Sequence, residues 1–454
     1  MKTKILAATF AAAALLLSAA TTLEAKPKSG ETQSSLNLKS SFVDTMNPNG
    51  LKKDGVKDYG LKSGTADQTK TLQRAIDEIS AGGGGILTIT DGTYYINGVN
   101  LKSNVHIVVS EGVTFRLTQA TGAKAKPGGL FFNFSTTNEN TKEYIENCSI
   151  RGVDGKHYTV DYTEFENDGT SVRFVIARMV KNFLVADALI KDNYTLHCGI
   201  TFTPSTIEGA NSWGISRPTN GEIRHCSIID ANSGYGLCQL HGAQDLYFED
   251  LYSLGGVTLR LESGSGGGNA GVYDVKAHKV HSENARASLM MSPHVAQNGI
   301  VLVDGISSVS SGGTVIIHKG FIDRKNKDQL GKQPGTYAKG SKVINIHGVY
   351  GEKSQVHDKE IYICNPVGGA LNRYKFNDFD NPKCYIGPSY AVVYDGTEGM
   401  YSVECSNISG EGFPSHNDKV LFESDIEDRA KRKKEILESL PDYRPRPEKT
   451  PKKK

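Results

Sequence analysis

The stretch Leu246–Glu262, LYFEDLYSLGGVTLRLE, decides the fold: a short apolar strand, a turn with two glycines and a second short strand. Comparable strand cores recur along the middle of the chain, at intervals of 40, 23, 26, 28 and 43 residues. They begin at Phe183, Ile223, Leu246, Val272, Ile300 and Val343. Three consecutive steps of about 25 residues, with longer steps between, indicate the coils of a solenoid that carries insertions.

Helical periodicity is almost absent between Ser80 and Asp425, which excludes a barrel of alternating strands and helices. A β-sandwich is compatible with many short strands, but the coil-like period favours an all-β solenoid. We therefore predict a right-handed parallel β-helix.

The segment before the repeats predicts a cap for the solenoid. Leu72, Ile76 and Ile79 have helical spacing, which predicts a helix over 68–80 with Asp67 able to cap it. Short strands are predicted beyond it at 86–90, 94–96, 105–109 and 113–117. A helix at this place would cover apolar core and strand edges that the end of a solenoid otherwise exposes.

Composition shifts at both ends divide the chain. Lys2 and Lys4 precede an apolar run over 5–17 and then small residues, which predicts a signal peptide at 1–25 and an exported protein. We predict a linker at 26–41, a β-helix catalytic domain at 42–424, and a C-terminal helix with a basic tail at 425–454. No later apolar run approaches the ~18 residues of a membrane span, so none is expected.

The net charge of +2 conceals an uneven distribution. Residues 429–454 hold 11 Lys/Arg against 4 Asp/Glu, a net of +7, and residues 1–25 carry +1, which leaves −6 for the rest. This balance argues against dedicated nucleic-acid binding. The seven cysteines lack metal-ligand spacing, and their odd number in an exported protein leaves at least one thiol unpaired. We expect a monomer that requires no cofactor; a structural Ca²⁺ or Na⁺ stays open.

Three polar residues form a candidate catalytic stripe: Gln239, Glu262 and His294, at steps of 23 and 32 residues. Residues one coil apart in a β-helix lie above one another at roughly 4.8 Å, the strand spacing. A carboxyl group beside a Gln, a His and Arg260 suits acid/base chemistry with substrate clamps. From spacing alone, a polar ladder on a solvated sheet face is the commoner origin of such a stripe.

Several motifs resemble those of a known family. The segments 59–76 and 91–105 resemble the start of polygalacturonases and their relatives, which implies a right-handed β-helix. The motifs GYGLCQLHGA (234–243), GGVTLRLE (255–262) and PHVAQNG (293–299) resemble the iota-carrageenases, glycoside hydrolase family 82. Segments 309–321 and 385–389 extend the resemblance.

The resemblance implies an inverting endo-hydrolase of a sulfated red-algal galactan. The resemblance implies that Glu262 is the general acid. It also implies that Gln239 and His294 bind water or substrate, and that Arg260 faces a sulfate group. We also predict that Tyr235, His241 and Lys319 contact the substrate.

One position departs from the family pattern. The family has an Asp two residues after the catalytic Glu, as the base that activates water, and this chain has Gly264 there. A sulfate-binding Arg expected after Val309 is also not evident, since Ile316 and Ile317 occupy that region. The insertion between Phe321 and Val343 is too short for the lid domain of some members.

Three explanations follow from this departure. In the first, the enzyme hydrolyses a different galactan with a base from another coil, such as Asp274 or His294. In the second, it is a lyase that cleaves a uronic-acid polymer by elimination. In the third, it is a non-catalytic polysaccharide-binding β-helix. We favour a secreted hydrolase of an anionic, sulfated polysaccharide, because Glu262, Gln239, Arg260 and His294 are all present.

Overall fold

The computed structural model describes residues 36, 38–119, 128–137, 143–165, 170–205, 217–264, 270–325, 327–364, 372–373 and 384–439. Residues 1–36 and 37–454 are separate units, and every element below belongs to the second. The predicted signal peptide, most of the predicted linker and the basic tail beyond Ser439 lie outside the described residues.

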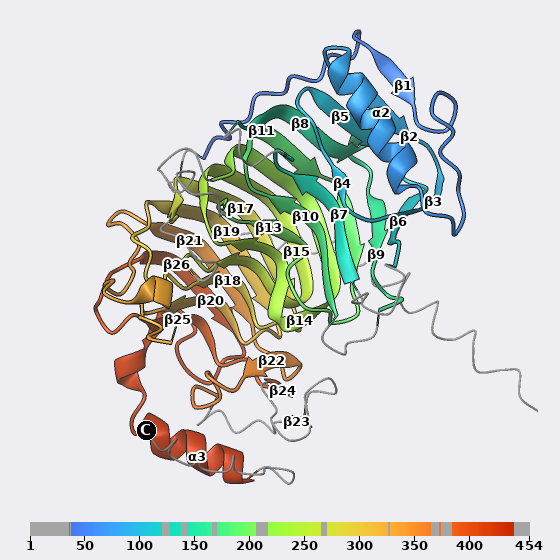
Figure 1. The fold of residues 1–454 in the computed structure, drawn as a ribbon. Helices are drawn as coiled ribbons and strands as arrows, with labels where there is room; N and C mark the ends of the chain where they lie inside the picture. The colour runs from blue at the N-terminus through green and yellow to red at the C-terminus, as the bar shows by residue number, and fades with distance from the viewer. Residues whose placement is uncertain are drawn as a thin grey trace, which may run out of the picture. The chain divides into compact units, whose positions relative to one another are not determined.

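Parallel strands stack in three ladders, which are the three faces of a right-handed parallel β-helix, as predicted (Figure 1). The first ladder contains β1 (Lys52–Asp54), β2 (Gly85–Ile89), β5 (Val105–Val109), β8 (Ile145–Gly152), β11 (Val180–Ala186), β14 (Thr219–Leu240), β15 (Ala243–Leu261), β17 (Val275–Glu283), β19 (Val301–Val309), β21 (Lys342–Val349) and β26 (Glu404–Glu411). The second contains β3 (Gly92–Ile96), β6 (Val113–Leu117), β9 (Tyr158–Asp161), β12 (Ala188–Lys191) and part of β14.

The third ladder carries the predicted site. It contains β4 (Val99–Asn100), β7 (Gly128–Phe134), β10 (Ser171–Ala177), β13 (Ile200–Phe202), the ends of β14 and β15, β18 (Ala287–Met291), β20 (Gly313–His318), β25 (Ala391–Gly396) and β27 (Val420–Phe422). The short β16 (Val272–Tyr273) pairs with β15. The predicted strands and repeat units are confirmed, with boundaries shifted by up to four residues.

Aromatic rings stack through the coils inside the helix. Phe132 packs edge-on against Phe115 and Phe174, with ring centroids 5.6 and 5.8 Å apart, and Phe202 packs in the same way on Phe248 at 5.7 Å. All of these side chains are fully buried. Equivalent inward-facing positions of successive coils lie directly above one another. An aromatic ring in one coil therefore packs against the aromatic ring at the same position of the next coil.

A ladder of Asn and Asp residues forms one corner of the coils. Six in-register residues have left-handed backbone with φ between 52° and 62°: Asn104, Asn147, Asn182, Asn220, Asp245 and Asp274. Asn and Asp tolerate this conformation better than other residues with a side chain. Nδ2 of Asn182 donates to Oδ1 of Asn147 at 2.8 Å, so the corner is also bonded from coil to coil.

Helix α2 (Thr69–Ala81) covers the first coil and contacts β2, β4 and β5, which confirms the predicted cap (Figure 1). Its residues Leu72, Ile76 and Ile79 are buried, as their helical spacing predicted. The prediction for Asp67 is corrected in detail: Gln68 occupies the N-cap position, and Asp67 accepts the N–H of Thr69 at 2.9 Å from one residue further out.

An extended segment before β1 crosses the first ladder. Val43 exchanges two hydrogen bonds with Asn182 of β11, at 2.8 and 2.9 Å. Asp44 forms two bonds with the Arg151 guanidinium of β8, at 2.6 and 2.9 Å. We name residues 38–48 the strap, because they touch strands from several coils.

A second segment covers the outer face of the third ladder downstream of β15. Val356 and Ile361 belong to one apolar cluster with Met290 of β18 and Ile316 of β20. Glu360 accepts from the buried Arg286 guanidinium, with Nε 3.0 Å from Oε2. The segment begins with β22 (Ser354–His357), which forms a small antiparallel sheet with β24 (Cys384–Gly387) and β23 (Asn372–Arg373). The exposed part of this face therefore ends near β15.

The C-terminal helix is shorter than predicted. Helix α3 spans Arg429–Ser439, and residues 423–425 form a 3₁₀ turn instead. Two further 3₁₀ turns span Val153–Gly155 and Lys327–Gln329. All seven cysteines are free thiols in the structure. No helix in the described ranges is long and apolar enough to cross a membrane.

The corner ladder predicts a stability effect at Asn182. Asn182→Ala loses the bonds to Asn147 and Val43 and forces an alanine into left-handed backbone, which together cost about 2 kcal/mol or more. Asn182→Gly loses the same bonds without the backbone cost and is the matched control. We expect urea denaturation to rank stability as wild type, then Gly, then Ala. Equal midpoints for all three would contradict the role of the ladder.

Candidate active site

The predicted catalytic residues lie where the strands of the third ladder end. In-register pairing places Thr201 of β13 beside Gln239 of β14, and Gln239 beside Arg260 of β15. Glu262 follows the last residue of β15 directly. The parallel register thus collects polar side chains from three consecutive strands at one edge of the face.

Glu262 is the centre of the cluster. Its Oε2 accepts from Nε2 of Gln239 at 2.7 Å, and its Oε1 accepts from an Nη of Arg260 at 2.7 Å. Nε2 of His294 lies 3.5 Å from the same Oε1. The structure therefore brings together the four residues of the predicted set around one carboxylate whose side chain is 15% exposed.

The way in which these residues meet differs from the prediction. Gln239 stacks on Arg260, not on Glu262, so the expected single stripe at coil period is wrong. Glu262 lies one residue beyond the end of β15, and its side chain points back to Gln239 and Arg260. His294 lies three residues after the end of β18 in left-handed backbone, φ 46°, and packs on Phe321 with ring centroids 4.3 Å apart.

The charge state of Glu262 is set by its neighbours. Burial raises the pKa of the carboxyl, but the Arg260 guanidinium and the His294 imidazole lower it by more. The net result is a pKa well below the usual 4.5. Glu262 is therefore an ionised carboxylate at neutral pH in this structure.

Arg260 has hydrogen-bonding capacity left over. Its residue surface is 9% exposed, and Nε and one Nη are buried without a hydrogen-bond partner. Its guanidinium carbon is 5.9 Å from the ring centroid of Tyr235. Buried donors are normally satisfied, so these two N–H groups suit an acceptor that a ligand supplies.

The other predicted contacts have different surroundings. Tyr235 is half-buried beside Arg260, and its ring packs edge-on to His197 at 5.4 Å. Nδ1 of His241 lies 3.1 Å from the backbone carbonyl of Glu262, so this ring contacts the main chain that carries the carboxylate. Lys319 is 46% exposed and ion-paired with Glu398 at 2.8 Å, and it is not among the residues that contact Glu262 in the described ranges.

Gly264 occupies a constrained position. Strand β15 ends at Leu261, so residues 262 and 264 do not share a strand face in this chain. Gly264 has φ 78°, and an added Cβ would lie 3.3 Å from Val295 Cγ2 and from the N atom of Ala296. The alternative base Asp274 is exposed in the corner ladder.

Sequence reasoning missed Arg173 and His197, which lie close to the predicted set. Arg173 of β10 donates from Nε to Oγ1 of Thr201 at 3.3 Å, and Thr201 is the in-register neighbour of Gln239. The available signal was a single Arg within the apolar strand 171–177. No motif pointed to it.

Metal ligands do not gather in the part of the chain that the structure describes: it holds no group of three or more His, Cys, Asp or Glu side chains suited to a metal ion. The chemistry below uses the side chains alone.

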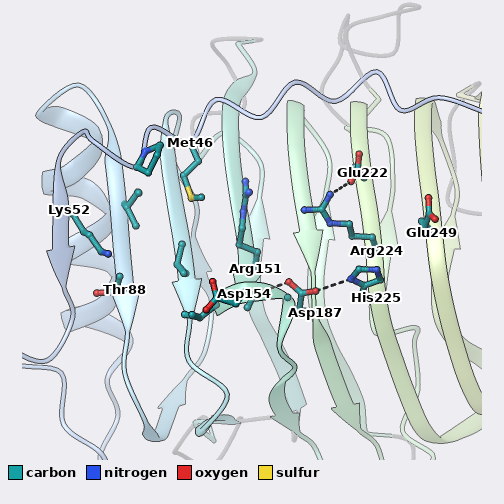
Figure 2. Close-up of a pocket in the computed structure, with 16 residues that line it drawn as sticks. Met46, Lys52, Thr88, Arg151, Asp154, Asp187, Glu222, Arg224, His225 and Glu249 are labelled. Atoms are coloured by element: carbon teal, nitrogen blue, oxygen red, sulfur yellow. Dashed lines mark hydrogen bonds and ion pairs between the residues drawn. The ribbon is translucent and has the colours of Figure 1, made fainter. Parts of the chain in front are cut away.

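A cavity of about 620 Å³ lies elsewhere, on the first ladder beside the strap (Figure 2). Its two arginines are ion-paired, Arg151 with Asp44 and Arg224 with Glu222, and the His225 ring lies 3.3 Å from Asp187; Lys52 also lines the wall. None of the predicted site residues lines it. Because carboxylates of neighbouring residues neutralise both arginines, this cavity is a weaker candidate for binding an anionic ligand than the Glu262 cluster.

Comparison with known proteins identifies relatives, although no family model matches the chain. An iota-carrageenase of Zobellia galactanivorans is 30% identical over 431 residues, covering 80% of this chain and 84% of the relative. An iota-carrageenase of Alteromonas macleodii is 31% identical, covering 81% and 85%.

Solved structures give the same result. A 1,3-α-1,4-β-D-galactose-4-sulfate-3,6-anhydro-D-galactose-2-sulfate 4-galactohydrolase superposes with a TM-score of 0.75 at 27% identity, over 86% of this chain and 95% of that one. An iota-carrageenase in complex with iota-carrageenan fragments superposes with a TM-score of 0.73 at 25% identity over the same shares. The resemblance seen in the motifs is thereby confirmed, and the chain belongs to the iota-carrageenase family of glycoside hydrolases.

Proposed function

We propose that the protein is an exported endo-hydrolase that cleaves a sulfated galactan of the iota-carrageenan type with inversion. The observation that carries the proposal is the Glu262 cluster: a carboxylate held by Arg260, whose two other guanidinium nitrogens are buried without a hydrogen-bond partner. The relatives are named iota-carrageenases, and one is complexed with iota-carrageenan fragments. Export rests on the predicted signal peptide.

Glu262 is the general acid in this proposal. A general acid needs a proton, whereas Arg260 and His294 keep the pKa of free Glu262 low. When a substrate sulfate binds the Arg260 guanidinium, the interaction between Arg260 and the Glu262 carboxylate weakens. The pKa of Glu262 then rises. Protonation of the acid is thus coupled to the binding of a sulfated substrate.

His294 and Gln239 support the acid. Inverting glycosidases separate acid and base by roughly 6.5–9.5 Å, to leave room for water. Nε2 of His294 is 3.5 Å from Oε1 of Glu262, which is too close to leave room for the attacking water. We therefore propose that His294 controls the protonation of Glu262 and does not act as the base. Gln239, 2.7 Å away, orients the carboxyl and can bond a sugar hydroxyl.

Glu262→Gln tests the acid. We expect hydrolysis of iota-carrageenan to fall by about 10²–10⁴-fold, the usual share of general acid catalysis. Release of reducing ends is measured against Glu249→Gln, a control on the same strand that faces the first ladder. Equal activity of wild type and Glu262→Gln would remove Glu262 from its role. Ultraviolet absorbance of an unsaturated product would indicate elimination, and retardation in polymer gels without any release would indicate a binding protein.

Gly264→Asp tests whether the missing carboxylate limits the reaction. We expect no gain of activity and a loss of about 1–3 kcal/mol in stability, because the backbone is left-handed and Val295 and Ala296 are close. Gly264→Ala places a Cβ on the same left-handed backbone without adding a charge. A gain of hydrolysis for Asp alone would show that a carboxylate at 264 can supply the base.

The depressed pKa of Glu262 predicts a pH-dependent contribution to stability. A carboxyl whose pKa is lowered on folding stabilises the protein above its unfolded pKa, about 4.3, and this stabilisation is lost as pH falls further. We expect wild type to exceed Glu262→Gln in free energy of unfolding at pH 7. The difference should shrink below about pH 4. A difference independent of pH between 7 and 3 would contradict the ion pairs.

A further inference from the structure

Arg173 projects from β10 on the same ladder as the Glu262 cluster, upstream of it. We infer that Arg173 is a specificity-determining residue that binds a second anionic group of the polymer, on a sugar other than the one held at Arg260. The inference rests on the proposed function, because it takes the ligand to be an extended sulfated polysaccharide.

The position of Arg173 follows from the strand register. Ile176 of β10 pairs with Thr201 of β13, and the row continues through Gln239 to Arg260. Arg173 lies three residues before Ile176, and its Nε reaches Thr201 Oγ1 at 3.3 Å. Three strand steps separate β10 from β15, roughly 14 Å along the ladder. An extended polymer along the ladder would therefore meet Arg173 and Arg260 at different sugars.

Within the part of the chain that the structure describes, no carboxylate forms an ion pair with Arg173. Other arginines contact carboxylates within 4 Å: Arg116, Arg151, Arg224, Arg260, Arg286 and Arg429. In the described ranges Arg173 has no such ion pair, and its hydrogen bond goes to the hydroxyl of Thr201.

The surroundings of Arg173 also disfavour a cation without a partner. Burial lowers the pKa of the guanidinium, and the titratable groups that act on it include the Cys198 thiol, the phenols of Tyr235 and Tyr162, and the like-charged Arg178. Burial, with Arg173 and His241, lowers the pKa of His197 to about 4, so His197 is neutral at pH 7. Partial burial of an uncompensated cation costs free energy, which a bound anion recovers.

Tyr235 links the two cationic positions. Its ring contacts His197 at 5.4 Å and lies 5.9 Å from the guanidinium carbon of Arg260, while Arg173 acts electrostatically on its phenol. An aromatic ring near both guanidinium groups suits a sugar that lies between two anionic groups of the polymer, because the ring packs on the apolar face of the sugar. The chemical class recognised is therefore a polymer with closely spaced sulfates.

Arg173→Met in the Glu262→Gln background tests the inference by binding, so the result does not depend on cleavage. We expect Kd for iota-carrageenan oligosaccharides to rise about tenfold, the loss of one charge-assisted contact. We also expect log Kd to depend less steeply on log salt concentration, because one ion contact is gone. Affinity for chemically desulfated oligosaccharides should not change.

Two variants serve as controls. Arg224→Met removes one positive charge from the first ladder, where Arg224 is paired with Glu222, and should leave Kd unchanged. Arg173→Lys keeps the charge and should keep the salt dependence while recovering part of the affinity. Unchanged Kd and salt slope in Arg173→Met would overturn the inference and leave the proposed function standing. No binding of sulfated oligosaccharide by Glu262→Gln itself would overturn both.

Discussion

In-register stacking of parallel strands is the constraint on which the rest of this structure depends. Each coil places a residue directly above its counterpart in the coil below, so any feature of one coil is repeated or must be accommodated in the next. The aromatic stack through Phe115, Phe132 and Phe174 satisfies this constraint inside the helix. The Asn and Asp corner satisfies it where the backbone must turn left-handed. The same rule places Thr201, Gln239 and Arg260 in one row outside.

The active-site region uses residues that leave this regular pattern. Glu262 and His294 both follow the last residues of their strands, and His294 has a positive φ. Leaving the ladder lets two side chains from different coils meet on one carboxylate, which strict stacking does not allow. The segment around Val356 covers the ladder downstream, so the exposed surface lies on the upstream side, where Arg173 is found.

Much of this could be predicted from sequence, because periodic features leave periodic signals. The strand starts at Phe183 and Leu246 and the helix over Leu72 and Ile79 follow from spacing alone, and the chemical types of Glu262, Gln239 and Arg260 mark a site. Spacing could not predict that Glu262 meets Arg260 from its own strand, since that depends on where β15 ends. Arg173 could not be found from the sequence, because its significance comes from having no ion pair among the described residues, and ion pairing is a property of the folded chain.

The strap gives this solenoid a property that stacked coils alone lack. Coils that touch only their neighbours can open one at a time from an end, so the terminal coils are separated from the interior by small free-energy steps. The strap bonds β11 through Val43 and β8 through Asp44, and the Lys39 carbonyl accepts from Lys276 of β17. Opening of the first coils is thereby coupled to coils far along the axis. The ladder behind the active site consequently opens as one cooperative block, which keeps the spacing between its polymer-contacting residues constant.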